Sequence, residues 1–332
     1  MKKTLAYVDH NYHIKTKSGD FLREIFKSKF KIKNYWIGKE LIFERELFNY
    51  KNIFFFQILP STKQLKKFKN KNIMWAPMYD SPHFPYGFSD HFWRIIKYYD
   101  IKVLCFSNRL KKQLIKHKIK HLSLKYFKKP KNFNSVIKKL NIFFWDRGDL
   151  DIDDWINQFK FDDINKIYYL TFQRNKKFYF DRKIKKKIVL LKKNFLPKKK
   201  FLNLIKKSDI FICPRKKEGI GMAQVEAISM GKYLIGTKDS TMEDYIANQK
   251  IGQFISKRPK FHIDGNYLQK TKKFRKKYAA NGYKKFEKEK FKIIRFFSYK
   301  NYLNYSILKE THFDIFFYYK KLLRTIILFL KR

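Results

Sequence analysis

Two glutamates and two glycines stand close together at a spacing that could build an anion site. Glu218 and Glu226 are eight positions apart, and Gly219 and Gly221 closely follow the first of them. An apolar run precedes this motif and a helical pattern follows it, so the glycines are expected where a helix begins. Backbone N–H groups at such an end attract phosphate, while carboxylates accept hydrogen bonds from hydroxyl groups. The motif therefore predicts a site for a phosphate-bearing, hydroxyl-rich ligand such as a nucleotide-sugar.

The composition is that of a globular chain with a large positive charge. Of its 332 residues, 44% are hydrophobic and 19% aromatic, which argues against disorder and is enough for two domains. The net charge of +50 would suit an anionic membrane surface or a nucleic acid. Lysine is spread over almost every segment, however, and Asn, Ile, Phe and Tyr are abundant too, as in proteins from AT-rich genomes. The charge is therefore weak evidence for nucleic-acid binding and moderate evidence for a membrane surface.

The cysteines and the N-terminus indicate an intracellular protein. Cys105 and Cys213 lie in apolar, strand-like runs, which predicts two buried, reduced thiols. The first apolar segment, at 4–8, is too short for a signal peptide, so we expect the protein in the cytoplasm. No apolar run approaches the ~20 residues that a membrane span needs.

Short apolar runs alternate with helix-like segments, which predicts an α/β protein of two doubly wound domains. Strands are expected at 5–8, 53–56, 73–75, 102–106, 142–145, 167–170, 187–191, 210–212 and 233–236, and helices at 18–26, 109–117, 155–159 and 201–207. A polar, proline-containing stretch at 128–135 predicts a linker. The expected domains are therefore 1–134 and 135–285, followed by basic, aromatic helices at 286–332. Within these, 313–330 is expected to form an amphipathic helix that packs on the domains or lies on anionic lipid.

The region around the two glutamates resembles the donor-binding region of retaining GT-B glycosyltransferases (glycosyl transferases group 1), above all the branch that builds bacterial cell-surface polysaccharides. The resemblance rests on Ile212-Cys213-Pro214-Arg215, Glu218-Gly219-Ile220-Gly221-Met222, Glu226-Ala227-Ile228-Ser229-Met230-Gly231 and Thr241-Met242-Glu243-Asp244-Tyr245-Ile246. It is detailed over 205–250 and fainter at 8–26, 56–60, 76–80 and 105–107. It implies the GT-B fold, in which two Rossmann-like domains face each other across a cleft and C-terminal helices cross back.

The resemblance also implies roles for the residues of the motif. The backbone amides of Gly219, Ile220 and Gly221 would face the donor sugar and its phosphates. Glu218 would hold a sugar hydroxyl and orient the anomeric carbon, and Glu226 would accept hydrogen bonds from the ribose hydroxyls. The other donor-side candidates are Met222, Arg215, Lys216 and Gly19.

A cationic group must neutralise the diphosphate as it leaves, because negative charge grows there in the transition state. Arg147 follows the strand at 142–145, where the group that the chain resembles carries an arginine with this role. The lysine that usually follows five positions later is missing, since that position is Ile152. Lys216, Lys217 and Arg174 are the alternatives for the second cation, and the sequence does not choose among them.

Acceptor-side candidates are polar residues that follow two strands of the first domain, where ligands of open α/β sheets collect. His10 and His13 follow the first strand, and Asp80 and His83 follow the strand at 73–75. His10 is the candidate for a catalytic role, although in the retaining chemistry that the resemblance implies the leaving phosphate takes the acceptor proton. The acidic stretch 151–154 indicates helix N-terminal charge, so we expect no metal and no other cofactor.

Three functional hypotheses follow. The first is a glycosyltransferase that moves a sugar, with retention, from a nucleotide-diphosphate sugar to a glycan in cell-surface polysaccharide, lipopolysaccharide or capsule synthesis. Its acceptor would be lipid-linked, and its basic surface would hold it on the anionic inner leaflet of the cytoplasmic membrane. The second is a nucleic-acid-binding protein, which explains the charge and the aromatic residues but not Glu218 and Glu226, so no specific nucleic acid is expected. The third keeps the fold but lacks catalysis.

Overall fold

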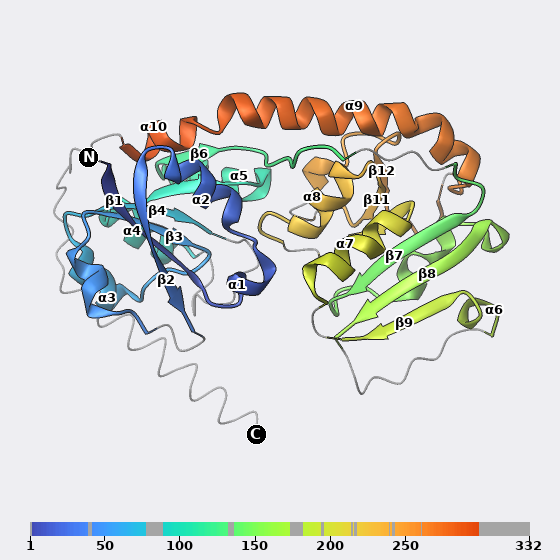
Figure 1. Cartoon of the computed structure of the whole chain (residues 1–332), viewed down its shortest axis with the longest axis horizontal. Coiled ribbons are helices and arrows are strands. Elements are labelled where there is room, and N and C mark those ends of the chain that lie inside the picture. The colour runs from blue at the N-terminus through green and yellow to red at the C-terminus, as the bar shows by residue number, and fades with distance from the viewer. Residues whose placement is uncertain are drawn as a thin grey trace, which may run out of the picture. The chain divides into compact units, whose positions relative to one another are not determined.

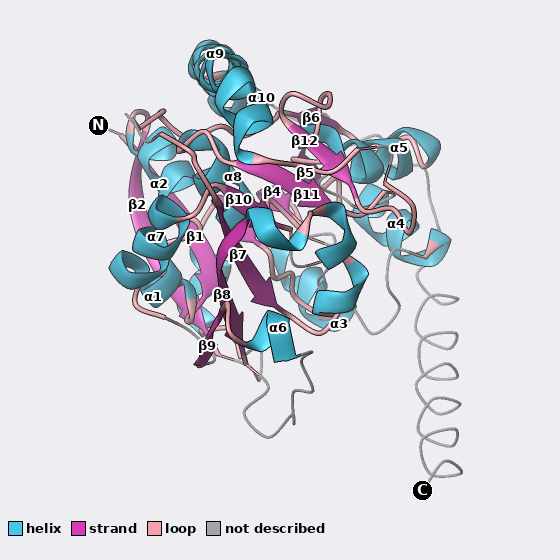
Figure 2. Ribbon diagram, turned by 90° about the vertical axis from the view of Figure 1, so that its right-hand side faces the viewer, coloured by secondary structure: helices cyan, strands magenta, loops and turns pink. Residues whose placement is uncertain are grey.

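The chain forms two parallel β-sheets with helices on their faces (Figure 1). The computed structural model describes residues 2–38, 42–77, 89–131, 136–172, 182–193, 196–213, 215, 218–238, 240, 243–259 and 261–298. Within these residues every strand pairing is parallel. Parallel sheets need cover on both faces, and Figure 2 shows helices on either side of the strands.

The first sheet has the strand order β2-β1-β3-β4-β5-β6. Its strands are β1 (Lys3–His10), β2 (Phe30–Ile37), β3 (Asn52–Phe56), β4 (Asn72–Ala76), β5 (Lys102–Cys105) and β6 (His121–Ser123). Its helices are α1 (His13–Thr16), α2 (Asp20–Lys27), α3 (Thr62–Leu65), α4 (Asp90–Tyr98) and α5 (Asn108–Lys116), with 3-10 turns at Arg45–Asn49 and Lys66–Phe68.

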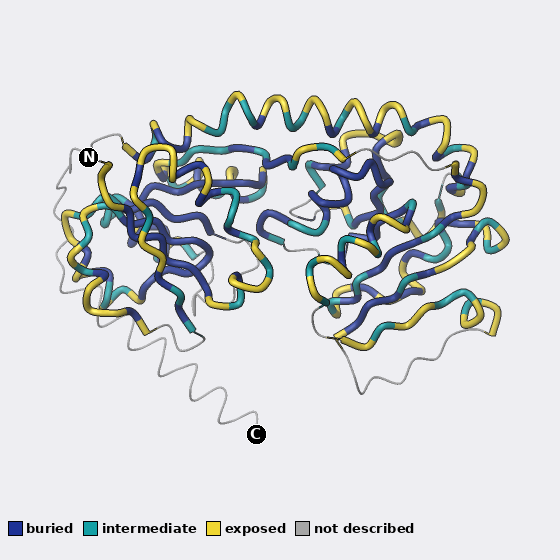
Figure 3. Tube along the Cα trace, viewed as in Figure 1, coloured by how far each residue is buried: buried dark blue, intermediate teal, exposed yellow. Residues whose placement is uncertain are grey.

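The second sheet has the order β12-β11-β10-β7-β8-β9. Its strands are β7 (Leu140–Asp146), β8 (Ile164–Thr171), β9 (Ile188–Lys192), β10 (Ile210–Ile212), β11 (Tyr233–Gly236) and β12 (Gly252–Phe254). Its helices are α6 (Arg182–Lys185), α7 (Lys198–Lys207) and α8 (Met222–Ser229), with 3-10 turns at Ile152–Asp154, Ile156–Gln158, Phe161–Asp163 and Glu243–Tyr245. The central strands of both sheets are buried, as the dark segments of Figure 3 show.

Two C-terminal helices connect the second sheet back to the first, as the GT-B resemblance implied. Helix α9 (Gly265–Glu289) packs on α8, and α10 (Lys292–Ser298) packs on α2, β4 and β6. Gly282 allows α9 to pass the connecting segment closely, because a Cβ there would lie 2.4 Å from the ring of Phe127. The expected helix at 313–330 lies outside the described residues.

Phe297 anchors the end of α10 on the first sheet. Its ring is fully buried between Phe26 and Phe30, with ring centroids 5.6 and 5.5 Å away. Its carbonyl oxygen accepts hydrogen bonds from Lys102 Nζ at 2.8 Å and Asn72 Nδ2 at 3.0 Å. A buried lysine of the first sheet thus binds the C-terminal end of α10.

All nine strands expected from the sequence are present, and the helices expected at 18–26, 109–117 and 201–207 correspond to α2, α5 and α7. The helix expected at 155–159 was wrong, because only a 3-10 turn, Ile156–Gln158, forms there. Asp151 caps the preceding turn, as expected of helix N-terminal charge. Trp155 then leaves the helical conformation, with a φ of −131°, and buries its ring against Phe144. The burial of this tryptophan prevents a continuous helix.

Both cysteines are free and buried, as predicted. Burial raises the pKa of Cys105 to about 11 and that of Cys213 further, so both thiols stay protonated at neutral pH. Within the described residues, no helix combines the length and apolarity that crossing a bilayer requires.

Two buried lysines should each make a contribution to the stability of the fold that rises with pH. Burial lowers the pKa of Lys102 and of Lys232 to about 8 in each case. The unfolded chain keeps these protons up to its ordinary lysine pKa of ~10.4, so between these values it binds more protons than the folded protein. Each of these lysines should therefore add to the free energy of unfolding as the pH rises from 8 to 10, whereas the raised pKa values of the two buried cysteines act in the opposite direction. In urea unfolding, the change in the free energy of unfolding between pH 8 and pH 10 should be lower for Lys102→Met than for the wild type, and Lys116→Met, at an exposed position, should keep the wild-type change; equal pH slopes for the two variants would refute the assignment.

Candidate functional site

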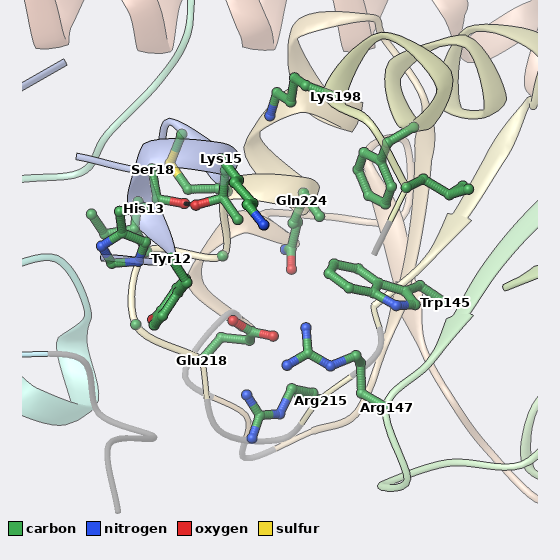
Figure 4. A pocket seen from close by; sticks show the side chains of 18 of the residues that line it. Tyr12, His13, Lys15, Ser18, Trp145, Arg147, Lys198, Arg215, Glu218 and Gln224 are labelled. Carbon is green, nitrogen blue, oxygen red and sulfur yellow. Dashed lines mark hydrogen bonds between the residues drawn. The ribbon is translucent and has the colours of Figure 1, made fainter. Parts of the chain in front are cut away.

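A cleft of about 1580 Å³ is lined by residues that follow strands of both sheets (Figure 4). The first sheet contributes the segment after β1 and the residue after β3. The second sheet contributes the segments after β7, β9 and β10. The carboxyl ends of parallel strands are where ligands of open α/β sheets bind. The cleft is therefore the candidate site by topology alone.

The glycine-rich turn ends in helix α8, whose N-terminus opens on the cleft. Gly219, Ile220 and Gly221 all line the cleft. Gly221 is the N-cap of α8 and has a φ of 60°, a left-handed conformation that glycine adopts without strain. The first N–H groups of a helix have no partner within the helix, and the helix dipole makes this end positive. The turn can therefore bind an anion.

Arg147 is held over the cleft by the end of strand β7. The preceding Asp146 is fully buried and accepts hydrogen bonds from the Gly148 N–H at 2.8 Å and from the Thr171 hydroxyl at 3.0 Å. The Arg147 guanidinium lies 4.5 Å from the centroid of the Trp145 ring, within cation–π range. An arginine side chain that only projects into solvent would lack this ring contact, so the position of the Arg147 guanidinium is more restricted. Figure 4 shows the Arg147 guanidinium and the Glu218 carboxylate pointing into the same space.

Glu226 lies behind the cleft surface rather than on it. Its side chain is 0% exposed, and Oε1 contacts Lys128 Nζ at 2.5 Å and Lys198 Nζ at 3.2 Å. Oε2 has only Lys131 Nζ, at 3.9 Å, and no hydrogen-bond donor among the described residues. Burial raises the pKa of this carboxyl, but Lys198 and Lys128 outweigh burial and hold it below its usual value. Lys198 also lines the cleft, so its side chain connects the buried Glu226 carboxylate with the cleft.

The segment after β1 carries a histidine whose tautomer the structure fixes. Buried Asp9 accepts a hydrogen bond from Arg23 and contacts Nδ1 of His13. A carboxylate paired with arginine is an acceptor, so the proton of His13 must lie on Nδ1. In the neutral imidazole Nε2 then carries the lone pair, and Nε2 makes no hydrogen bond within the part of the chain that the structure describes. His13 and His10 both line the cleft.

The cleft brings together most of the residues predicted from the sequence. These are His10, His13, Arg147, Arg215, Glu218, Gly219, Ile220, Gly221 and Met222. Gly19 does not line it; it precedes α2, where a Cβ would lie 2.9 Å from Asp9 Oδ2. Lys216, Asp80 and His83 lie outside the described residues. The roles assigned to all of these residues remain predictions.

Sequence reasoning missed several residues of the cleft. They include Tyr12, Gln57, Lys192, Lys193, Lys198 and Gln224. A rule that takes the polar residues directly after each apolar run would have found Gln57, which follows β3, and Lys192 and Lys193 at the end of β9. Lys198 is the first residue of helix α7 and does not directly follow any of the apolar runs expected as strands, so this rule would not have found it. In the described part of the chain, no group of three or more His, Cys, Asp or Glu residues could hold a metal ion.

Comparison with known proteins agrees with this architecture. Residues 174–285, about a third of the chain, match the family model of Glycosyl transferases group 1. No curated protein matches the chain. A glycosyltransferase from Rickettsia africae ESF-5 is similar in structure, with a TM-score of 0.55 and 13% identity over 89% of this chain and 99% of that one.

Two further solved structures are similar over most of their length. Anabaena Alr3699/HepE, in complex with UDP and glucose, has a TM-score of 0.52 and 12% identity over 88% of this chain and 98% of that one. WaaG, a glycosyltransferase involved in lipopolysaccharide biosynthesis, has a TM-score of 0.52 and 11% identity over 86% of this chain and 96% of that one. At these identities the similarity establishes the fold, which is GT-B as predicted.

Proposed function

We propose that this chain, which carries a Glycosyl transferases group 1 domain on a GT-B fold, is a glycosyltransferase that uses a nucleotide-diphosphate sugar. The observation that carries the proposal is the shared cleft of Arg147, Glu218 and the glycine-rich start of α8. A cation, a carboxylate and a helix N-terminus in one cleft suit a ligand with both phosphates and hydroxyls. A structural neighbour, Alr3699/HepE, was solved with UDP and glucose.

In this proposal the donor lies along α8. Its phosphates accept hydrogen bonds from the backbone N–H groups around Gly219 and Gly221, and Arg147 neutralises the diphosphate as it leaves. Glu218 accepts a hydrogen bond from a hydroxyl of the donor sugar. Glu226 binds the ribose, an assignment supported by its buried Oε2 without a hydrogen-bond donor among the described residues. Because Lys198 lies between Glu226 and the cleft, it has to turn aside when the ribose enters.

Lys198 is our candidate for the second cation of the diphosphate site. Ile152, at the position where the resemblance places a lysine, is buried in the core of the second sheet. Lys198 has its ammonium 3.2 Å from Glu226 Oε1 and lines the cleft with Arg215. Once the ribose hydroxyls occupy Glu226, the displaced ammonium is within reach of the phosphates. No metal ion or other cofactor is part of the proposal.

The acceptor is a glycan, held on the side of the cleft that β1 and β3 form, with His10 and His13 as its neighbours. Transfer occurs with retention: the C–O bond between the anomeric carbon and the leaving diphosphate breaks, a new C–O bond to the acceptor oxygen forms on the same face of the sugar, and the diphosphate takes the proton of the attacking hydroxyl. We further propose a lipid-linked acceptor in cell-surface polysaccharide synthesis and a peripheral position on the anionic inner membrane surface. The net charge of +50 supports the membrane surface, and WaaG, a neighbour in structure, acts in lipopolysaccharide biosynthesis.

Thermal unfolding of the protein with UDP, GDP, ADP, CMP and their common sugars tests the proposal. A ligand at ~100 times its dissociation constant should stabilise the folded state by about 2.7 kcal/mol. We expect one nucleotide family to raise the melting temperature, and NMR of the transfer product to show the anomeric configuration of the donor. Stabilisation by single-stranded nucleic acid alone, lost as salt rises, would favour the nucleic-acid alternative. A nucleotide shift without any transfer would favour a catalytically inactive GT-B protein.

A further inference from the structure

Gln57, the residue after strand β3, has a backbone conformation that a side chain disfavours. Its φ is 70°, and the N–H of Ile58 donates to the carbonyl oxygen of Phe56 at 2.9 Å. This bond closes a γ-turn with a positive φ at its centre, the rarer and strained form of that turn. Strand β4 holds the turn in place, because the Gln57 N–H donates to Ala76 O at 2.9 Å and Trp75 Nε1 donates to Gln57 O at 3.3 Å. Glycine would fit here without strain, so the glutamine side chain needs a reason of its own.

The Gln57 side chain points into the cleft with a polar group that the protein leaves unused. Gln57 is only 9% exposed and lines the cleft. The Tyr12 hydroxyl donates a hydrogen bond to its Oε1. Its Nε2 makes no hydrogen bond to any residue that the structure describes. If the amide is turned over, Tyr12 contacts the nitrogen and the oxygen is left instead, so either way one polar atom faces the cleft.

Two further rings lie beside Tyr12, which contacts this amide. The Tyr12 ring lies 4.4 Å from the ring of His10 and 4.1 Å from that of His13, between ring centroids. Amide and aromatic groups side by side match a sugar ring, which has an apolar C–H face and hydroxyl groups at its edge. Gln57 and Tyr12 carry no charge, which suits the hydroxyl oxygens of a neutral sugar. They follow strands of the first sheet, whereas Arg147 and Glu218 follow strands of the second.

We propose that Gln57 recognises the acceptor, and that the acceptor group bound there is a neutral sugar residue. The Gln57 amide donates a hydrogen bond to an oxygen of that sugar, while Tyr12 orients the amide and stacks against the ring. The strained γ-turn aims the side chain at the cleft. This inference rests on the proposed function and adds the class of acceptor and a residue that selects it.

Two substitutions separate the role of the amide from that of the backbone. Gln57→Gly removes both the amide and the strain, and Gln57→Asn keeps a residue that tolerates a positive φ but withdraws the amide from the cleft. Lys118→Gly is the matched control, because Lys118 also has a positive φ, of 54°, but is exposed and does not line the cleft. The probes are UDP-glucose as the donor and octyl β-glucoside as the acceptor.

We expect Gln57→Gly to melt at or above the temperature of the wild type. Its KM for octyl β-glucoside should rise by about 3- to 10-fold, the effect of one neutral hydrogen bond, with a smaller change in kcat. Gln57→Asn should show the same rise in KM, and Lys118→Gly should leave it unchanged. If the wild type transfers sugar and both Gln57 variants keep its acceptor KM, this inference alone fails. If the wild type transfers no sugar to the glycoside and UDP-glucose does not stabilise it, the inference and the proposed function fail together for this donor.

Discussion

Arg147→Ala should lower kcat by about 10²- to 10³-fold, the loss typical when a preorganised group that stabilises transition-state charge is removed. The guanidinium is stacked on Trp145 and follows the buried Asp146, so it needs little rearrangement to meet the leaving diphosphate. Charge on that group grows as the bond to the sugar breaks, and the loss should therefore fall mainly on kcat. Steady-state kinetics with the nucleotide-sugar that stabilises the wild type would measure it.

Two controls give the Arg147 result its meaning. Arg295→Ala removes an exposed arginine of α10 and should change neither kcat nor KM. Arg147→Lys keeps the charge but lacks the planar, forked donor group, so its activity should lie between those of the wild type and the alanine variant. A loss confined to the donor KM would mean that Arg147 binds the donor equally in the ground and transition states. Unchanged kinetics would remove it from the site.

Glu226→Gln should destabilise the fold by about 2 kcal/mol at pH 7. The substitution leaves Lys128 and Lys198 beside one another without the buried carboxylate that both contact. The lysine side chains are 35% and 32% exposed and can turn toward water, so the cost should stay below the 3–5 kcal/mol of a wholly buried pair. Urea unfolding gives the difference, and Glu24→Gln, which breaks an exposed pair with Lys27, should change stability by less than about 0.5 kcal/mol.

The cost of Glu226→Gln should depend on pH in a definite direction. The neighbouring lysines lower the pKa of Glu226 in the folded protein. Its stabilising effect is therefore complete above the ordinary carboxyl pKa of ~4.3 and is lost as the pH falls through the lower folded value. The difference between the wild type and Glu226→Gln should shrink on acidification below pH 4. A difference that stays constant down to pH 3 would contradict the assigned ion pairs.

The central strands could be predicted from the sequence, whereas most edge strands could not. Every strand that the apolar runs failed to indicate lies at the edge of a sheet: β2 and β6 in the first, β12 in the second. An edge strand is covered less completely and needs no continuous apolar run. Strand β2, Phe30–Ile37, contains two lysines and an asparagine in exposed or half-buried positions. The β12 and β6 strands are also only three residues long.

The site shows the same division between local and long-range information. The glycine turn and Arg147 could be located because each is defined by its neighbours in sequence, a strand end or a helix start. Lys198 could not be located, because its contact with Glu226 joins residues that lie far apart along the chain. The place of Gln57 after β3 could have been found, but its positive φ could not, because hydrogen bonds from strand β4 hold that turn. Lys128 and Lys131 meet Glu226 across about a hundred positions, which no spacing rule detects. The sequence therefore predicted Glu226 as a donor-binding residue but not the lysines that cover its carboxylate.

The crossing by α10 has a consequence for how the chain matures on the ribosome. Phe26 and Phe30 are made early, but Phe297, which packs between them, is made much later. At about 5–20 residues per second, roughly 10–50 s of synthesis separate Phe30 from Phe297. In the later part of that interval, once β6 has been made, the first sheet has an apolar patch uncovered and Lys102 lacks its carbonyl partner. The N-terminal half should therefore depend on holding factors or on slow, reversible folding until α10 arrives to cover it.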